Sequence, residues 1–327
     1  MSTEPAPTKV LYFNHGGEDL YDLVRGMAPP TVELVTLESG DPKERLAKIV
    51  DCEAVIVGGY RLERQYIDAA PRLRFVQNQG VGYHDTVDTN ALRERQIALA
   101  IAPGGTSVGV AEHALMLMLA VGKRLSFIDA ELRQGRWHSN DLRAESRQLG
   151  GATVGIVGLG RIGKELARLL TVFRTTVLYH DILEMPAELE RELKVTRVPL
   201  DELLARSDYV TLHVPLTKET KHLINAESVK RLKRGAILIN CARGPVVSEK
   251  ALVDALASGH LAGAGLDVFE VEPPPEPTPL GKFRNVVLTP HNAPGTVEAM
   301  KLKMIDIFAN IERFRNGEAL ADRIELG

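Results

Sequence analysis

Three glycines near the middle of the chain have the spacing of a phosphate-binding turn. A strand predicted over Thr153–Val157 leads directly into Gly158-Leu159-Gly160-Arg161-Ile162-Gly163 and a helix over Lys164–Leu170. In this pattern the first glycine permits a tight turn, the second lets the backbone approach a pyrophosphate, and the third lets helix and strand pack closely. Free N–H groups at the helix N-terminus favour an anion. The turn therefore predicts a dinucleotide site that includes Gly158, Gly160, Arg161, Ile162 and Gly163.

An acidic residue follows at the distance that such a site requires. The next predicted strand, Thr176–Tyr179, leads to Asp181, which lies 18 residues after Gly163. A carboxylate at this position accepts hydrogen bonds from the ribose hydroxyls of the cofactor and repels a 2′-phosphate. No arginine follows Asp181 immediately, so we expect NAD rather than NADP.

Composition excludes several other classes of protein. The 327 residues carry 40 Lys+Arg and 43 Asp+Glu, a net charge of −3, which argues against a chain that coats nucleic acid or an anionic membrane. Two cysteines give no disulfide framework, and the scattered histidines predict no metal site. The longest apolar run, Ala114–Val121, is too short to cross a bilayer. We expect a cytoplasmic protein of roughly two domains.

Short apolar runs alternate with longer amphipathic ones, as in parallel α/β sheets. The first series of predicted strands is Val10–Phe13, Val32–Leu37, Ala54–Val57, Phe75–Gln77 and Ala98–Ile101, with helices at Asp41–Val50 and Thr89–Arg95. Pro103-Gly104-Gly105 then predicts a hinge, and Thr106 and Ser107 are expected to cap a helix over Val110–Val121. The second series continues with strands at Val195–Val198, Val210–Val214, Ala236–Asn240, Ala264–Val268 and Val286–Thr289. The charge runs Glu188–Lys194 and Lys230–Arg234 are expected to be solvated helix faces. A last helix is predicted over Thr296–Arg315.

At this point the chain resembles the D-isomer-specific 2-hydroxyacid dehydrogenases, including glyoxylate/hydroxypyruvate reductases and phosphoglycerate dehydrogenases. The resemblance is carried by the glycine turn and by the blocks Leu212–Thr217, Asn240–Gly244, Leu266–Pro273 and Thr289–His291, in the order of the family. It implies a Rossmann-type nucleotide-binding domain over residues 104–289, inserted into a flavodoxin-like substrate domain made of residues 1–103 and 290–327. It also implies a homodimer through the helix near Val110–Val121.

The resemblance implies a catalytic group formed by Arg243, Glu272 and His291, and the chemistry of these side chains agrees with it. Oxidation of a secondary alcohol needs a base for the hydroxyl proton, and histidine titrates near neutrality. A carboxylate orients the ring and stabilises the imidazolium, while an arginine binds a carboxylate or polarises a keto oxygen. The implied cofactor contacts further include His213, Val214, Pro215, Cys241, Ala242, Arg243, Asp267, His291 and Ala293. Cys241 has no neighbouring base and is expected to be inert.

The substrate is expected to bind between two sets of loops. The resemblance implies that backbone N–H groups of Val81 and Gly82 hold the substrate carboxylate together with Arg243. The strand Ala54–Val57 ends before Tyr60 and Arg61, which together with Tyr83 are expected to contact the variable end of the substrate. Arg61 could instead begin the following helix and pair with a surface acid.

The sequence departs from the family at Thr106, where many relatives have Asn, and at Asn292-Ala293-Pro294-Gly295, which leaves the substrate range open. The main hypothesis is hydride transfer between NAD and C2 of a small D-2-hydroxy or 2-keto acid such as glyoxylate or hydroxypyruvate. Formate dehydrogenases place Gln where this chain has Glu272, which counts against formate. A phosphite-type dehydrogenase and an NAD-binding corepressor both keep the catalytic group and stay as alternatives. No nucleic-acid or membrane partner is expected.

Overall fold

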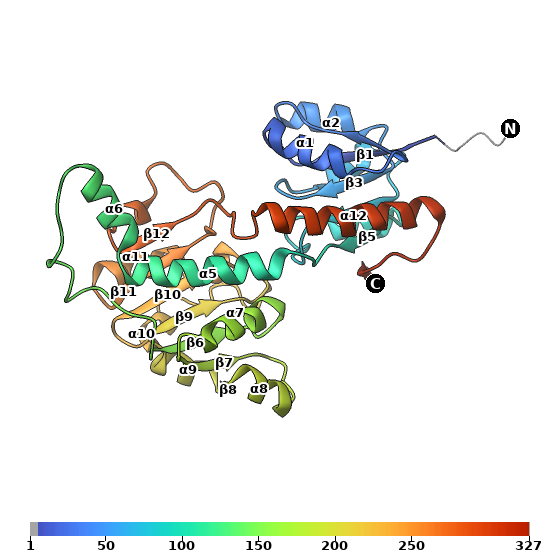
Figure 1. Cartoon of the computed structure of the whole chain (residues 1–327). Helices are drawn as coiled ribbons and strands as arrows, with labels where there is room; N and C mark the ends of the chain where they lie inside the picture. Colours follow the sequence, from blue (N-terminus) through green and yellow to red (C-terminus); the bar gives the residue numbers. More distant parts are fainter. Residues whose placement is uncertain (1–5, 327) are drawn as a thin grey trace. The chain divides into compact units, whose positions relative to one another are not determined.

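The chain folds into two α/β units in the computed structural model, which describes residues 6–326 (Figure 1). One unit comprises Met1–Thr106 and Thr296–Gly327, and the other is the continuous segment Ser107–Gly295. The second unit therefore interrupts the first in the sequence. The division lies a few residues beyond the predicted boundaries at 103 and 289, so that His291 belongs to the second unit.

A mainly parallel sheet forms the centre of the first unit. Its strands have the order β13-β5-β4-β3-β1-β2, and only β13 is antiparallel to its neighbour. The order 2-1-3-4-5 of the parallel strands is that of flavodoxin-like folds. The strands are β1 (Thr8–Phe13), β2 (Val32–Val35), β3 (Ala54–Val57), β4 (Phe75–Asn78), β5 (Ala98–Ile101) and β13 (Arg323–Ile324). The helices are α1 (Glu18–Met27), α2 (Pro42–Ile49), α3 (Arg64–Ala69), α4 (Thr89–Glu94) and α12 (Val297–Asn316).

Helices cover both faces of this sheet, which explains why β3 and β4 are buried along their whole length. The helices α2, α3 and α4 contribute to the core on one face, and α1 and α12 to the core on the other. The return of the C-terminal helix is fixed by a buried hydrogen bond of 2.9 Å from Asn310 Nδ2 to Gln77 Oε1, and by the pairing of β13 with β5.

The second unit contains a seven-stranded parallel sheet with the order β12-β11-β10-β9-β6-β7-β8. Its strands are β6 (Thr153–Val157), β7 (Thr176–His180), β8 (Val195–Arg197), β9 (Tyr209–Leu212), β10 (Ala236–Asn240), β11 (Leu261–Leu266) and β12 (Val286–Leu288). Its helices are α5 (Thr106–Gly122), α6 (Leu125–Arg133), α7 (Arg161–Thr171), α8 (Ala187–Leu193), α9 (Leu200–Arg206), α10 (Ser228–Arg231) and α11 (Glu249–Ala257), with 3₁₀ turns η1 (Gly244–Val246) and η2 (Pro279–Lys282). Strand order reverses between β6 and β9, the place where open α/β sheets bind ligands.

Several element boundaries differ from the prediction. Thr106 and Ser107 lie inside the first turn of α5 rather than before the helix. The strand predicted at Val210–Val214 is Tyr209–Leu212, and the one predicted at Ala264–Val268 is Leu261–Leu266. Both strands therefore end earlier, which places His213, Val214 and Asp267 in loops at the carboxyl edge of the sheet. The strand β13 was not predicted, because two residues at a sheet edge have no periodic pattern.

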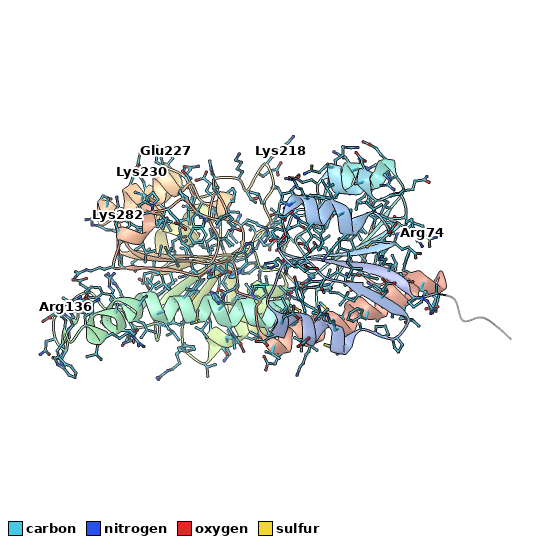
Figure 2. The ribbon with its side chains drawn as sticks, turned by 90° about the horizontal axis from the view of Figure 1, so that it is seen from above. Arg74, Arg136, Lys218, Glu227, Lys230 and Lys282 are labelled. Atoms are coloured by element: carbon cyan, nitrogen blue, oxygen red, sulfur yellow. The ribbon has the colours of Figure 1, made fainter. Side chains whose placement is uncertain are left out.

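The charge runs lie at the surface, as expected for solvated faces. Lys230, at the end of α10, pairs with Glu227 at 2.9 Å, and these side chains are 68% and 76% exposed. Figure 2 shows both side chains at the outside of the molecule. Within residues 6–326 no helix is both long and apolar enough to cross a membrane.

Candidate active site

The glycine-rich turn lies between β6 and α7, at the carboxyl edge of the second sheet. Gly158 has a left-handed φ of +95°, and a Cβ there would lie 2.8 Å from the carbonyl oxygen of His213. A Cβ at Gly163 would lie 2.3 Å from the carbonyl oxygen of Gly158, so only glycine lets α7 approach this closely. Open space surrounds the Cβ position of Gly160, the N-cap of α7. The backbone at the start of α7 is therefore accessible to an anion.

Asp181 follows β7 and stands beside this turn. Its Oδ2 accepts a hydrogen bond of 2.7 Å from the backbone N–H of Leu159, and its Oδ1 accepts one of 2.9 Å from Leu183. A carboxylate so close to a phosphate-binding turn is suitably placed for ribose hydroxyls. Two neighbours of Asp181 were not predicted. Arg197 donates from Nη2 to the carbonyl oxygen of Asp181 at 3.2 Å, and Ile182, which is 92% exposed, offers an apolar surface next to it.

A hydrogen-bonded pair joins His291 and Glu272. The Nδ1 of His291 lies 2.7 Å from Oε2 of Glu272, and the side chains are 44% and 35% exposed. The other carboxylate oxygen accepts a hydrogen bond of 2.9 Å from the backbone N–H of Phe269. Burial alone would raise the pKa of Glu272, but His291, the Phe269 N–H and the charge of Arg243 lower it below 4.5. Glu272 is therefore ionised at neutral pH, and Nε2 of His291 is the nitrogen left for proton transfer.

The Arg243 turn packs against the segment that carries Glu272. The side chain of Asn240, at the end of β10, folds this turn: its Nδ2 donates to the carbonyl oxygen of Arg243 at 3.0 Å, and its Oδ1 accepts from Ala242 at 3.0 Å. A Cβ at Gly244 would lie 1.7 Å from the carbonyl oxygen of Phe269. Glycine is thus required for the two segments to touch, and their contact brings Arg243 near Glu272.

Asp267 is the centre of a buried hydrogen-bond network and is only 1% exposed. Its Oδ1 accepts from Thr289 Oγ1 at 2.6 Å and from the backbone N–H of Asn292 at 3.0 Å, while its Oδ2 accepts from Ala293 at 2.8 Å. The Nε2 of His113, on α5, lies 2.9 Å from Thr289 Oγ1. Asp267 therefore holds the residues that follow β12, and its Oδ2 retains a lone pair for a carboxamide N–H.

Burial shifts the pKa of two further cofactor candidates, His213 and Cys241. Burial lowers the pKa of His213 to about 4, so the ring is neutral at pH 7. Burial and the carboxylate of Asp267 raise the pKa of the Cys241 thiol, which agrees with the inert packing role predicted for it. In the described part of the chain, no group of three or more His, Cys, Asp or Glu residues is placed to hold a metal ion.

The substrate loops of the first unit follow β3 and β4 at the carboxyl edge of its sheet. Val81 is 39% exposed, and the rings of Tyr83 and His84 stack at 4.0 Å. Tyr60 is partly buried and lies under the guanidinium of Arg45, which is 4.3 Å from its ring centre. Its ring is therefore held against the core, and its hydroxyl packs against Gly40, where a Cβ would lie 2.6 Å from it.

Arg61 does not have the structural role that was considered for it. The following helix α3 begins at Arg64, and Arg61 precedes it in an exposed position beside the bridge between Leu62 and Val87. Among residues 6–326, Arg61 forms no hydrogen bond or ion pair.

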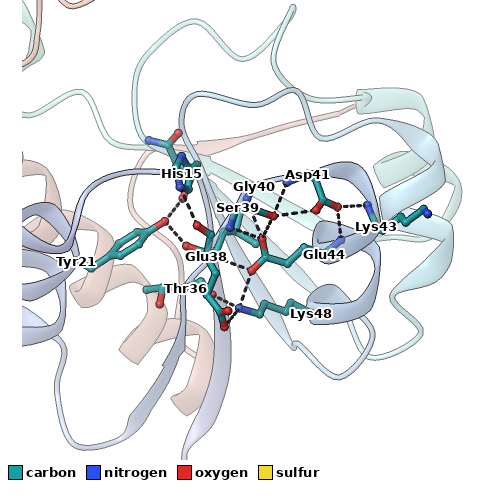
Figure 3. Close-up of polar contacts among 12 residues, drawn as sticks. His15, Tyr21, Thr36, Glu38, Ser39, Gly40, Asp41, Lys43, Glu44 and Lys48 are labelled. Atoms are coloured by element: carbon teal, nitrogen blue, oxygen red, sulfur yellow. Dashed lines mark hydrogen bonds and ion pairs between the residues drawn. The ribbon is translucent and has the colours of Figure 1, made fainter.

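A third loop at this edge, between β2 and α2, is closed by the side chain of Glu44 (Figure 3). Its carboxylate accepts hydrogen bonds from the backbone N–H groups of Glu38, Ser39 and Gly40 at 2.6, 2.8 and 2.8 Å, and pairs with Lys48 at 2.7 Å. Burial would raise the pKa of Glu44, but these donors lower it far below the usual range. This loop is thus rigidly fixed by an ionised side chain.

The structure groups the predicted site residues into two sets. Because all strands of the second sheet are parallel, the glycine turn, Asp181, His213, Cys241, Asp267 and His291 lie at its one carboxyl edge. Tyr60, Arg61, Val81 and Gly82 lie at the corresponding edge of the first sheet. The roles predicted for both sets in binding stay predictions. Thr289, His113 and the backbone of Phe269 were not predicted as site residues.

Comparisons with known proteins agree with this geometry. Residues 115–293 match the family described as D-isomer specific 2-hydroxyacid dehydrogenase, NAD binding domain. A glyoxylate reductase of Korarchaeum cryptofilum is 38% identical over 300 residues, which cover 91% of this chain and 87% of the relative. A D-3-phosphoglycerate dehydrogenase of Mycobacterium tuberculosis is 36% identical over 297 residues, or 90% of this chain and 55% of the relative, so this chain spans about half of that protein. The crystal structure of NAD-dependent formate dehydrogenase from Staphylococcus aureus in complex with NAD has a TM-score of 0.84 and 29% identity, with 97% of this chain and 99% of that one covered.

The chain therefore belongs to the D-isomer-specific 2-hydroxyacid dehydrogenases. It is an NAD-dependent oxidoreductase that transfers hydride to and from 2-keto and 2-hydroxy acids. The predictions of family, fold class, activity and cofactor are confirmed.

Proposed function

We propose that the enzyme interconverts a short 2-keto acid, such as glyoxylate or hydroxypyruvate, and the corresponding 2-hydroxy acid, with Arg243, Glu272 and His291 as its catalytic residues. The observation that carries the proposal is the 2.7 Å contact of His291 with an ionised Glu272, at the sheet edge that also carries the glycine turn. The glyoxylate reductase named above, which aligns over most of its length, supports the choice of a short substrate.

Each side chain has a distinct task in this reaction. The residues of the glycine turn and Asp181 would hold NADH, which supplies the hydride for C2 of the keto acid. Protonated His291 gives its Nε2 proton to the carbonyl oxygen as C2 is reduced, and it takes the proton back in the reverse reaction. Glu272 keeps the ring oriented and stabilises the imidazolium. Arg243 binds the substrate carboxylate, because its planar guanidinium can donate two parallel hydrogen bonds to the two oxygens.

We propose that the first unit is the substrate domain. Its candidate substrate contacts are the backbone N–H groups of Val81 and Gly82 for the carboxylate, and Tyr60 and Arg61 for the variable end. Arg61 supports this role because it is exposed and engaged in no ion pair with another described residue. A charged or hydroxylated tail suits this loop better than a long alkyl chain.

The test is NADH oxidation with glyoxylate, hydroxypyruvate and pyruvate. His291→Ala should lower kcat by roughly 10²–10⁴-fold, which is the usual contribution of general acid–base catalysis to the rate. His260→Ala is a matched control, since His260 bonds the carbonyl oxygen of Leu232 at the amino end of β11. Full activity in His291→Ala would reject the assigned role. Turnover with none of these three keto acids would contradict the proposed choice of a short substrate.

We further propose a homodimer formed through α5 and α6. Apolar side chains are exposed along this part of the chain, namely Val108 (53%), Met116 (45%), Leu119 (36%), Leu125 (53%), Leu132 (55%) and Trp137 (76%). Helical spacing places Val108, Met116 and Leu119 on one face of α5. A monomer rarely leaves so many large apolar groups in water. A cytoplasmic location stays an expectation from composition.

The single tryptophan reports directly on this interface. Light scattering should give twice the chain mass, and dilution into monomer should shift the emission of Trp137 to longer wavelength as its ring enters water. Met116→Asp should give monomers. The control is Val172→Asp, which should stay dimeric, because Val172 is equally apolar and 77% exposed but lies at the C-terminal end of α7, outside α5 and α6. A wild-type monomer at micromolar concentration would contradict the proposal.

A further inference from the structure

His222 lies in the loop between β9 and α10, outside the segments assigned a role above. Its φ is +51°, in the left-handed region where a residue other than glycine is strained. Its backbone N–H donates to the carbonyl oxygen of Pro245 at 2.8 Å. Its Nε2 lies 2.6 Å from Oε1 of Glu270. One residue in a strained conformation is thus bound to two other segments at once.

These two segments are the ones that carry the proposed catalytic residues. Pro245 lies two positions after Arg243, and Glu270 lies two positions before Glu272. The segments also touch directly, since a Cβ at Gly244 would lie 1.7 Å from the carbonyl oxygen of Phe269. The backbone contact continues along the loop, where the N–H of Ile224 donates to Val246 at 3.1 Å. His222 therefore links the Arg243 turn to the Glu272 segment, through its hydrogen bonds to Pro245 and Glu270.

Glu270 is held from a second direction as well. Its Oε2 accepts a hydrogen bond of 3.0 Å from the N–H of Glu249, the first residue of α11, and its own N–H donates to Oε1 of Glu249 at 2.8 Å. Burial opposes ionisation of Glu270, but Glu249 and His222 outweigh it and lower the pKa of this carboxyl. The carboxylate is therefore a strong acceptor for the imidazole of His222.

We propose that His222, through Glu270, is a positioning residue that sets the placement of Arg243 relative to Glu272. The inference rests on the proposed roles of those two residues. Arg243 orients the substrate carboxylate and Glu272 orients His291, so their separation determines whether the keto carbon and the proton donor meet. A displacement of about 1 Å at such a site can cost 10²-fold in rate.

The decisive variant is His222→Gly, because glycine accepts the left-handed φ and removes only the imidazole. Its thermal unfolding should stay close to wild type, since the relief of backbone strain offsets the lost hydrogen bond. We expect kcat/KM for glyoxylate to fall by about 10- to 100-fold, while KM for NADH does not change. His222→Gln, which keeps an N–H donor on a longer chain, should recover part of the activity. Glu270→Gln should resemble His222→Gly, and the double variant should lose little more than either single one.

A matched control separates positioning from general backbone effects. Lys194 also has a left-handed φ, +53°, at the end of α8, so Lys194→Gly relieves the same strain away from the catalytic segments. It should keep wild-type kinetics. The inference is overturned if His222→Gly has wild-type kcat/KM, or if KM for NADH rises as much as kcat/KM for glyoxylate falls. If instead Glu272→Gln and His291→Ala are fully active, the proposed function itself fails, so the two failures are distinguishable.

Discussion

Replacing Glu272 by Gln is expected to move the pH dependence of keto-acid reduction while leaving the fold intact. Reduction consumes the protonated form of His291, and the ionised carboxylate 2.7 Å from its Nδ1 stabilises that form. Glutamine has the same shape and its amide oxygen still accepts the Nδ1 hydrogen, so the ring stays oriented. It carries no charge, so the imidazolium loses its stabilisation and the alkaline limb of the profile moves to lower pH.

The size of this shift follows from the geometry. A hydrogen bond to a charged group contributes about 1.5–3 kcal/mol, and about 1.4 kcal/mol corresponds to one pH unit. The two side chains are 44% and 35% exposed, so solvent screening places the effect near the lower end of this range. We therefore expect the alkaline limb of kcat/KM to move down by about one pH unit.

The assay is NADH oxidation at saturating cofactor, with kcat/KM for glyoxylate measured from pH 5 to 10. Glu276→Gln is the control, because Glu276 also precedes a proline in the same loop and is exposed. It should leave the profile unchanged. If Glu272→Gln keeps the wild-type profile, Glu272 does not stabilise the imidazolium and the assigned pairing is wrong.

Three further predictions test other parts of the structure. Asp181→Ala should raise kcat/KM for NADPH and narrow the preference for NADH, since it removes the repulsive carboxylate and leaves the cation of Arg197, which bonds the carbonyl oxygen of residue 181. A wild-type enzyme that is faster with NADPH would contradict the role of Asp181. Arg61→Ala should cost about 1–3 kcal/mol in kcat/KM for hydroxypyruvate and little for glyoxylate, which has no tail; equal losses would show that Arg61 only supports its loop. Glu44→Gln should lower the free energy of unfolding by about 1–3 kcal/mol at pH 7, because three backbone donors lose an ionised acceptor. As the folded pKa of Glu44 is depressed, this difference should be complete above its ordinary pKa of 4.5 and shrink as the pH falls below it. The control in the urea titrations is Glu298→Gln, at an exposed position of the same unit.

Much of the cofactor site could be predicted because it is local in the sequence. The three glycines, the start of α7 and Asp181 lie within one βαβ unit, where steric demands dictate both the residue types and their spacing. Most strands were predicted within one or two residues for a related reason, since strands covered on both faces are continuous apolar runs. The residues Arg243, Glu272 and His291 were found only through resemblance to a family, because no spacing rule connects them.

Contacts between distant segments depended on the tertiary structure. His222 and Glu270 are 48 residues apart, and Asn310 and Gln77 are 233 apart, so no sequence period could pair them. Arg197 reaches Asp181 only because β8 pairs with β7. The strand β13 exists only because the segment after α12 runs back along β5 and pairs with it. Residue types and local spacing thus determined the class of chemistry, because turns and caps are short-range constraints. Strand order decided which side chains support it, because that order alone brings remote segments to the same edge of a sheet.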